Sequence, residues 1–103
     1  MVSLEEIRGD LKEIRYYYSR KEHFDKAFAE VTSNSVLEKV HKYNSIVSTA
    51  PPRLYDLYIS LYVNNLTQEA LSHELGYTPE YIQMQNKRLL LFLQSSFRDN
   101  AMT

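Results

Sequence analysis

Residues 67–93 read TQEALSHELGYTPEYIQMQNKRLLLFL, a stretch with residues typical of two helix starts and one helix end. Thr67 suits the N-cap of a helix, because its hydroxyl can accept a hydrogen bond from an unpaired backbone N–H group. Gly76 suits the left-handed residue that ends a helix. Thr78 followed by Pro79 suits the start of the next helix. The stretch therefore predicts two helices joined by a short turn.

The apolar residues around this turn predict how the two helices pack. Leu71 and Leu75 share one face of the first helix, and Ile82 follows at a distance that lets it pack back on both. Ser72 is small enough for the helices to approach closely. These spacings are typical of a helix-turn-helix, although a plain helical hairpin uses the same capping residues and is the alternative.

The composition predicts one all-α domain. The chain has 103 residues, only two glycines and three prolines, and no cysteine, so it offers few turns and no disulfide or thiolate chemistry. Its first residues are charged and no apolar run has the length of a membrane span, so we expect a cytoplasmic protein with no membrane partner. The formal net charge of −1 is unusual for a DNA-binding domain. Any positive patch must therefore come from the placement of its basic residues.

Two capping boxes predict an N-terminal pair of helices. Residues 3–6 begin the first helix, and residues 35–38 begin the second after a polar break at residues 32–35. A heptad-like apolar seam marks the first helix, and its members are Leu4, Ile7, Leu11, Ile14 and Tyr18. Phe24, Phe28 and Val31 continue this apolar face with a shifted phase. Of the three consecutive tyrosines 16–18, we expect two to pack inward.

The segment Ser48–Pro52 divides the chain, since two consecutive prolines cannot continue a helix. Residues 1–49 are then a helical pair for packing or oligomerisation, and residues 50–103 are a trihelical helix-turn-helix unit packed on it. An apolar helix within residues 54–62 would be the first support helix of this unit. Residues 89–93 are apolar all round, so they are expected to be buried between the two halves or in a dimer interface.

The sequence contains no pattern of catalytic residues. His23, His41 and His73 have no partner at a metal-binding helical spacing, and the carboxylates alternate with lysine and arginine as solvated ion pairs do. A glycine-rich phosphate loop and a nucleophile elbow are both absent. We therefore expect neither enzymatic activity nor a metal or cofactor.

Residues 61–93 resemble region 4 of the sigma-70 family. The matching residues are Leu66-Thr67-Gln68-Glu69, Leu75-Gly76, Thr78, Ile82, Leu89, Leu90 and Leu93. Over the whole chain, including residues 16–19 and 50–55, the sequence is similar to phage and prophage transcriptional regulators of the ArpU and RinA type. The resemblance implies a recognition helix that enters the major groove of double-stranded DNA. Its DNA-binding residues would be Thr78, Pro79, Glu80, Tyr81, Gln83, Met84, Lys87 and Arg88.

The side chains of this helix suggest how it would read DNA. Gln83 can pair with an adenine edge, Glu80 can accept from cytosine, and Lys87 and Arg88 can contact phosphates. Sigma factors commonly carry arginine at the positions of Pro79 and Gln83, so guanine readout is not expected. Gln85 occupies a position that is usually apolar. Either the helix is rotated, or that face meets another chain.

Three functions remain open from the sequence. The first is a sequence-specific DNA-binding transcriptional regulator of phage genes, a homodimer formed through the N-terminal seam or the leucine-rich end. The second is a protein-interaction module that binds RNA polymerase or another regulator through Tyr81, Met84 and Leu91. The third is a small terminase-like subunit for DNA packaging, which would form a ring of many subunits.

Overall fold

The computed structural model describes residues 2–23 and 34–101, and every regular element within these ranges is a helix. The prediction of an all-α fold is confirmed. The elements, in chain order, are α1 (Leu4–His23), α3 (Asn34–Val47), α4 (Pro52–Tyr58), the π-helical segment η1 (Ile59–Val63), α5 (Gln68–Leu75) and α6 (Pro79–Ala101).

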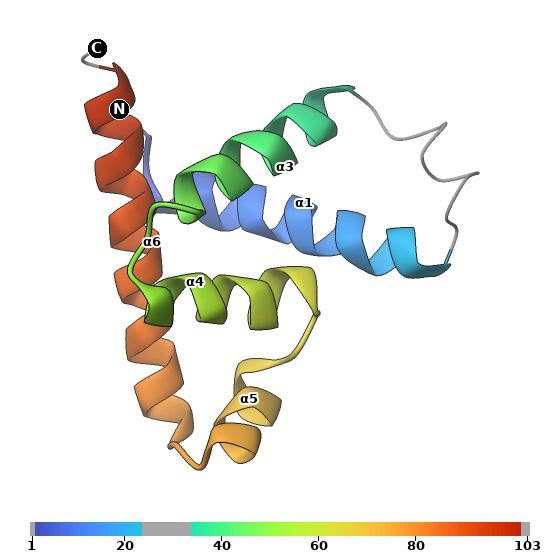
Figure 1. Ribbon diagram of the computed structural model, residues 1–103, viewed down its shortest axis with the longest axis vertical. Helices are drawn as coiled ribbons and strands as arrows, with labels where there is room; N and C mark the ends of the chain where they lie inside the picture. The colour runs from blue at the N-terminus through green and yellow to red at the C-terminus, as the bar shows by residue number, and fades with distance from the viewer. Residues whose placement is uncertain (1, 24–33, 102–103) are drawn as a thin grey trace.

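The long helix α6 organises the packing of the others. It runs along one side of the molecule, while α1, α3 and α4 meet it from the same side and α5 lies near its N-terminal end (Figure 1). Leu89, Leu90 and Leu93 are at most 1% exposed and belong to one apolar core with residues of α1, α3 and α4. Three of the five residues of the predicted buried run 89–93 are therefore buried between α6 and the other helices.

Helix α1 begins as the capping residue predicts, and its apolar seam faces the core. The backbone N–H of Glu6 donates to Ser3 Oγ over 3.1 Å. Ile7, Leu11 and Ile14 are at most 1% exposed. The seam that could have joined two protomers is thus occupied within a single chain. Of the three tyrosines, Tyr16 is exposed and the other two are half-buried, as predicted.

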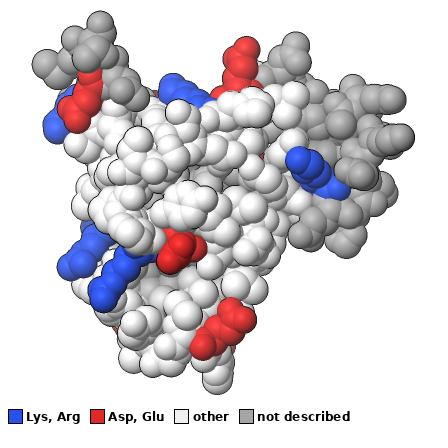
Figure 2. All heavy atoms as spheres, in the orientation of Figure 1, with Lys and Arg blue, Asp and Glu red and all other residues white. Residues whose placement is uncertain are grey.

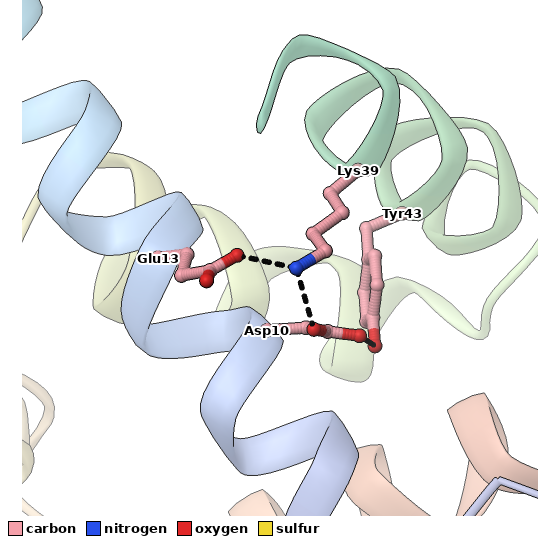
Figure 3. Close-up of polar contacts among 4 residues, drawn as sticks. All are labelled: Asp10, Glu13, Lys39 and Tyr43. Atoms are coloured by element: carbon pink, nitrogen blue, oxygen red, sulfur yellow. Dashed lines mark hydrogen bonds and ion pairs between the residues drawn. The ribbon is translucent and has the colours of Figure 1, made fainter. Parts of the chain in front are cut away.

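A polar cluster joins α1 to α3 beside this seam. Lys39 Nζ lies 2.7 Å from Glu13 Oε2 and 3.4 Å from Asp10 Oδ1, while the hydroxyl of Tyr43 donates to Asp10 Oδ2 over 2.7 Å (Figure 3). The hydrogen bond to Glu13 raises the pKa of Lys39, and burial raises the pKa of Tyr43, because both favour the protonated forms. The cluster is fully explained by its role in holding the two helices together.

The joint at Pro51 and Pro52 lies where the prolines predict, since α3 ends at Val47 and α4 begins at Pro52. Helix α3 begins at Asn34, so the predicted cap Ser35 lies one residue inside it. Phe24, Phe28 and Val31 lie outside the described residues, as do the first two residues of the break predicted at residues 32–35. The last two residues of that predicted break belong to α3, so this part of the prediction was wrong.

The end of the α4–η1 helix was not predicted. Residues 59–63 widen into a π-helical turn, in which the N–H of Asn64 donates to Ile59 O over 2.8 Å. Asn65 then takes a left-handed backbone conformation with φ 61°, which asparagine tolerates better than most residues. Neither feature breaks the apolar periodicity, so the sequence pattern could not reveal it.

Two expectations of burial were wrong. Leu75 is 55% exposed, because it lies in the last turn of α5, on the rim of a surface pocket. Leu91 is 46% exposed, because it points away from the core that Leu90 and Leu93 enter. The second half of α6 is therefore not buried on every side. No helix within the described ranges is long and apolar enough to cross a membrane.

Candidate functional site

The turn between α5 and α6 has the hydrogen bonds that its capping residues predict. Thr67 Oγ1 accepts from the N–H of Ala70 over 3.0 Å, and Thr78 Oγ1 accepts from the N–H of Tyr81 over 3.1 Å. Gly76 has φ 73° and ψ 22°, in the left-handed region, and its N–H donates to Ser72 O. Both helix ends are thus fixed by local bonds, which sets the direction in which α6 leaves the turn.

Helix α5 packs closely against the first turns of α6. Leu71, Ser72 and Ile82 are at most 3% exposed, and the hydroxyl of Ser72 donates to Glu69 O over 2.7 Å. A larger side chain in place of Ser72 would push the two helices apart. The predicted contact of Ile82 with the apolar face of α5 therefore involves Leu71, with Leu75 left at the rim.

The structure brings four of the eight predicted DNA-binding residues together. Glu80, Gln83, Met84 and Lys87 line one shallow depression, which we call the α6 face. Thr78, Pro79 and Arg88 are also exposed, but they do not line it. The α6 face also includes Asn86 and Leu90 of α6, together with two residues of other elements, Arg8 of α1 and Gln68 of α5.

Tyr81 lies apart from the α6 face. Its ring centroid is 4.5 Å from that of Tyr77, and its hydroxyl accepts from Arg53 Nη1 over 3.3 Å. These contacts place the half-buried Tyr81 against the turn and α4, so its neighbours differ from those of the other predicted residues.

Arg8 is the basic residue of this surface that sequence reasoning missed. It lies on α1, next to the buried Ile7, and reaches the α6 face only because α1 packs beside α6. The charged residues that line the α6 face are Arg8, Glu80 and Lys87, which gives two basic against one acidic, whereas the whole chain has a net charge of −1. No local sequence signal could have indicated this pairing, since 79 positions separate the two basic residues.

Arg15 and Tyr62 hold the elements around the α6 face in place. Arg15 Nε donates to Asn65 Oδ1 over 3.2 Å and its Nη2 donates to Asn65 O over 3.3 Å, which ties α1 to the loop before α5. The hydroxyl of Tyr62 donates to Asn86 Oδ1 over 2.6 Å, which ties η1 to α6. Burial raises the pKa of Tyr62, so this donor stays protonated at neutral pH.

Figure 2 shows basic and acidic side chains scattered over a largely uncharged face, with no continuous basic area on the part of it that the structure describes. Among the described residues, no group of three or more histidine, aspartate or glutamate side chains is placed to hold a metal ion.

Comparisons with known proteins assign no relative to the chain: no family model, no curated protein and no solved structure matches it. The function must therefore be argued from the site itself.

Proposed function

We propose that this protein is a sequence-specific DNA-binding regulator of phage or prophage genes, with α6 as the helix that reads the major groove. The observation that carries the proposal is the α6 face, where the exposed Gln83 and the two basic residues Arg8 and Lys87 line the same depression. Phosphate contacts position a protein on DNA, while amide side chains read base edges. A single exposed surface that carries both basic side chains for phosphates and an amide side chain for base edges has the composition of a groove-binding surface.

The packing behind α6 supports the same proposal. A recognition helix has to project from a rigid support, and the capped turn, the buried Ser72 and the Tyr62–Asn86 hydrogen bond provide one. The first half of α6 keeps most of its polar side chains free of the core. Glu80 lies on the same surface and would repel phosphates, which favours a role for it at a cytosine edge.

The test is selection of bound duplexes from a randomised DNA pool, followed by anisotropy titrations over a salt series. We expect the logarithm of affinity to fall linearly with the logarithm of salt concentration. Lys87→Ala should weaken binding to all sequences and reduce the salt slope by about 1. Gln83→Ala should relax the preference at one base pair, at a loss of about 1–3 kcal/mol.

Arg98→Ala is the matched control for Lys87→Ala. It removes one positive charge from an exposed position on the same helix, 11 residues or about 16 Å further along. It should leave both the affinity and the salt slope unchanged. The proposal fails if the protein selects no duplex at low salt, or if both variants weaken binding equally.

A protein-interaction function has one observation in its favour. Met84 and Leu91 lie seven residues apart on the outward side of α6 and are 44% and 46% exposed. Paired apolar anchors at this spacing are typical of a helix that binds a protein groove. Binding to purified RNA polymerase after nuclease treatment, lost in Leu91→Glu but retained in Lys87→Ala, would favour this function over DNA binding.

A further inference from the structure

A second surface depression shares no lining residue with the α6 face. Its volume is about 260 Å³. Apolar side chains form most of its wall, contributed by α4, α5 and α6, and they are Leu57, Leu71, Leu75 and Ile82. The paired rings of Tyr77 and Tyr81 flank it. We call it the α4–α6 pocket.

Gln85 is the unusual member of this pocket. It is 8% exposed, in a part of α6 where the neighbouring inward positions are Ile82 and Leu89. Among the described residues, its amide has no hydrogen-bond partner in the protein. Every side-chain nitrogen or oxygen that is completely enclosed in this part of the chain does have a partner. The amide must therefore reach the pocket surface. There it can exchange hydrogen bonds to water for hydrogen bonds to a molecule that enters the pocket.

We propose that the α4–α6 pocket binds a small, uncharged, planar molecule that presents a hydrogen-bond donor and acceptor side by side to the Gln85 amide. The amide has one donor edge and one acceptor edge, so a lactam group matches both. The apolar wall and the two tyrosine rings match the rest of a flat aromatic ring system.

Size and charge narrow the ligand class further. The volume is slightly below the roughly 300–1,000 Å³ of pockets for drug-sized ligands, so a fragment-sized bicyclic molecule fits. Arg53 and Asp56 line the pocket with opposite charges, so neither a cation nor an anion is favoured overall. A charged ligand would also lose hydration against the leucine wall without full compensation. This inference does not depend on the proposed DNA binding, because it concerns a different surface.

The test uses two matched probes, 2-quinolinone and N-methyl-2-quinolinone, titrated into the full chain labelled with ¹⁵N. The N-methyl compound keeps the ring system and the carbonyl but lacks the donor. We expect 2-quinolinone to shift the side-chain NH₂ signals of Gln85 and the backbone signals of pocket residues, and to bind about fivefold more tightly, as the loss of one ordinary hydrogen bond implies.

Gln85→Leu is the companion variant, since leucine keeps a similar volume and suits an apolar pocket. It should bind both probes with equal affinity. Equal affinities of the two probes for the unaltered protein, or no shift at Gln85 up to the solubility limit, would overturn the proposal. The comparison of the two probes on the unaltered protein tests the proposal even if Gln85→Leu does not fold.

Discussion

The two halves of α6 differ in their structural role, since the first half is mostly exposed and the second half packs in the core. In residues 79–88 six of the ten side chains are exposed, and four of these are polar, while in residues 89–97 four side chains enter the core that α1, α3 and α4 share. The first half depends for its position on the turn at Gly76, on α5 and on the hydrogen bond from Tyr62 to Asn86, whereas the second half depends on the core shared with α1, α3 and α4. A substitution in the second half should therefore act on folding, and one in the first half on binding.

Leu93→Ala should have the largest effect, because it removes a completely buried side chain from the second half of α6. Leu93 is 0% exposed, so the substitution leaves a cavity and should lower the free energy of unfolding by about 2–5 kcal/mol. Urea denaturation followed by circular dichroism measures the loss. Leu91→Ala, the same truncation at a position that is 46% exposed, should lower it by less than about 1 kcal/mol. Similar losses in the two variants would contradict the assigned orientation of this half.

Alkaline pH should weaken the same half of the helix. Tyr43 packs edge-to-face against Phe97 of α6, with ring centroids 5.0 Å apart, and burial raises its pKa well above the ordinary value. Burial also raises the pKa of Tyr58, whose hydroxyl donates to Asn44 Oδ1 over 2.7 Å. Below about pH 10 both phenols are protonated in the folded and unfolded states, so their contribution to stability is fully present. Above it the unfolded chain releases protons that the folded chain retains, and stability falls.

The slope of this loss can be measured with one substitution. Each retained tyrosine proton should lower stability by roughly 1.4 kcal/mol per pH unit above pH 10. Tyr58→Phe should reduce the slope by about that amount, while it lowers stability at pH 7 by about 1 kcal/mol through the lost hydrogen bond. Chemical denaturation at pH 7 to 11 tests both effects. The exposed Tyr16→Phe is the control, and an unchanged slope in Tyr58→Phe would refute the assignment.

The sequence predicted the local structure of both halves for different reasons. The turn before α6 depends on residues with strong intrinsic preferences, Thr67, Gly76 and Thr78, so its hydrogen bonds could be predicted. Burial of Leu89, Leu90 and Leu93 followed from their apolar character. The exposed Leu75 and Leu91 could not be identified, because periodicity gives the position of a residue around its helix but not the neighbours that cover it.

The candidate site was predicted only in part, because the sequence shows which residues share a helix face but not which other elements pack beside it. Gln83 and Lys87 are next to each other on one helix, so their common face follows from helical geometry. Arg8 joins them through the packing of α1, and Gln85 lies in a pocket that needs α4 and α5 for its walls. The sequence marked Gln85 as out of place, but only the packing shows where its amide lies.

The final prediction concerns the turn that orients the first half of α6, and the chain's two glycines provide a matched pair. An added Cβ would meet no atom within 4 Å at either Gly9 or Gly76, so crowding cannot distinguish them. Gly9 lies within α1, where alanine is the better helix former, and Gly9→Ala should raise the free energy of unfolding by roughly 0.5–1 kcal/mol. Gly76 has φ 73°, which strains any side chain, so Gly76→Ala should lower it by roughly 1–2 kcal/mol.

Urea denaturation of the two alanine variants tests whether the free energy of unfolding rises in Gly9→Ala and falls in Gly76→Ala. NMR spectra of the two variants should show a second difference between them, because strain at Gly76 acts on the turn itself. Amide signals of residues 76–82 should shift in Gly76→Ala while those of the buried residues 89–97 stay in place, since the core holds the second half of α6 independently of the turn. Shifts that extend through the whole helix would mean that its two halves respond as one rigid unit, and the division of tasks between them would then have no structural basis.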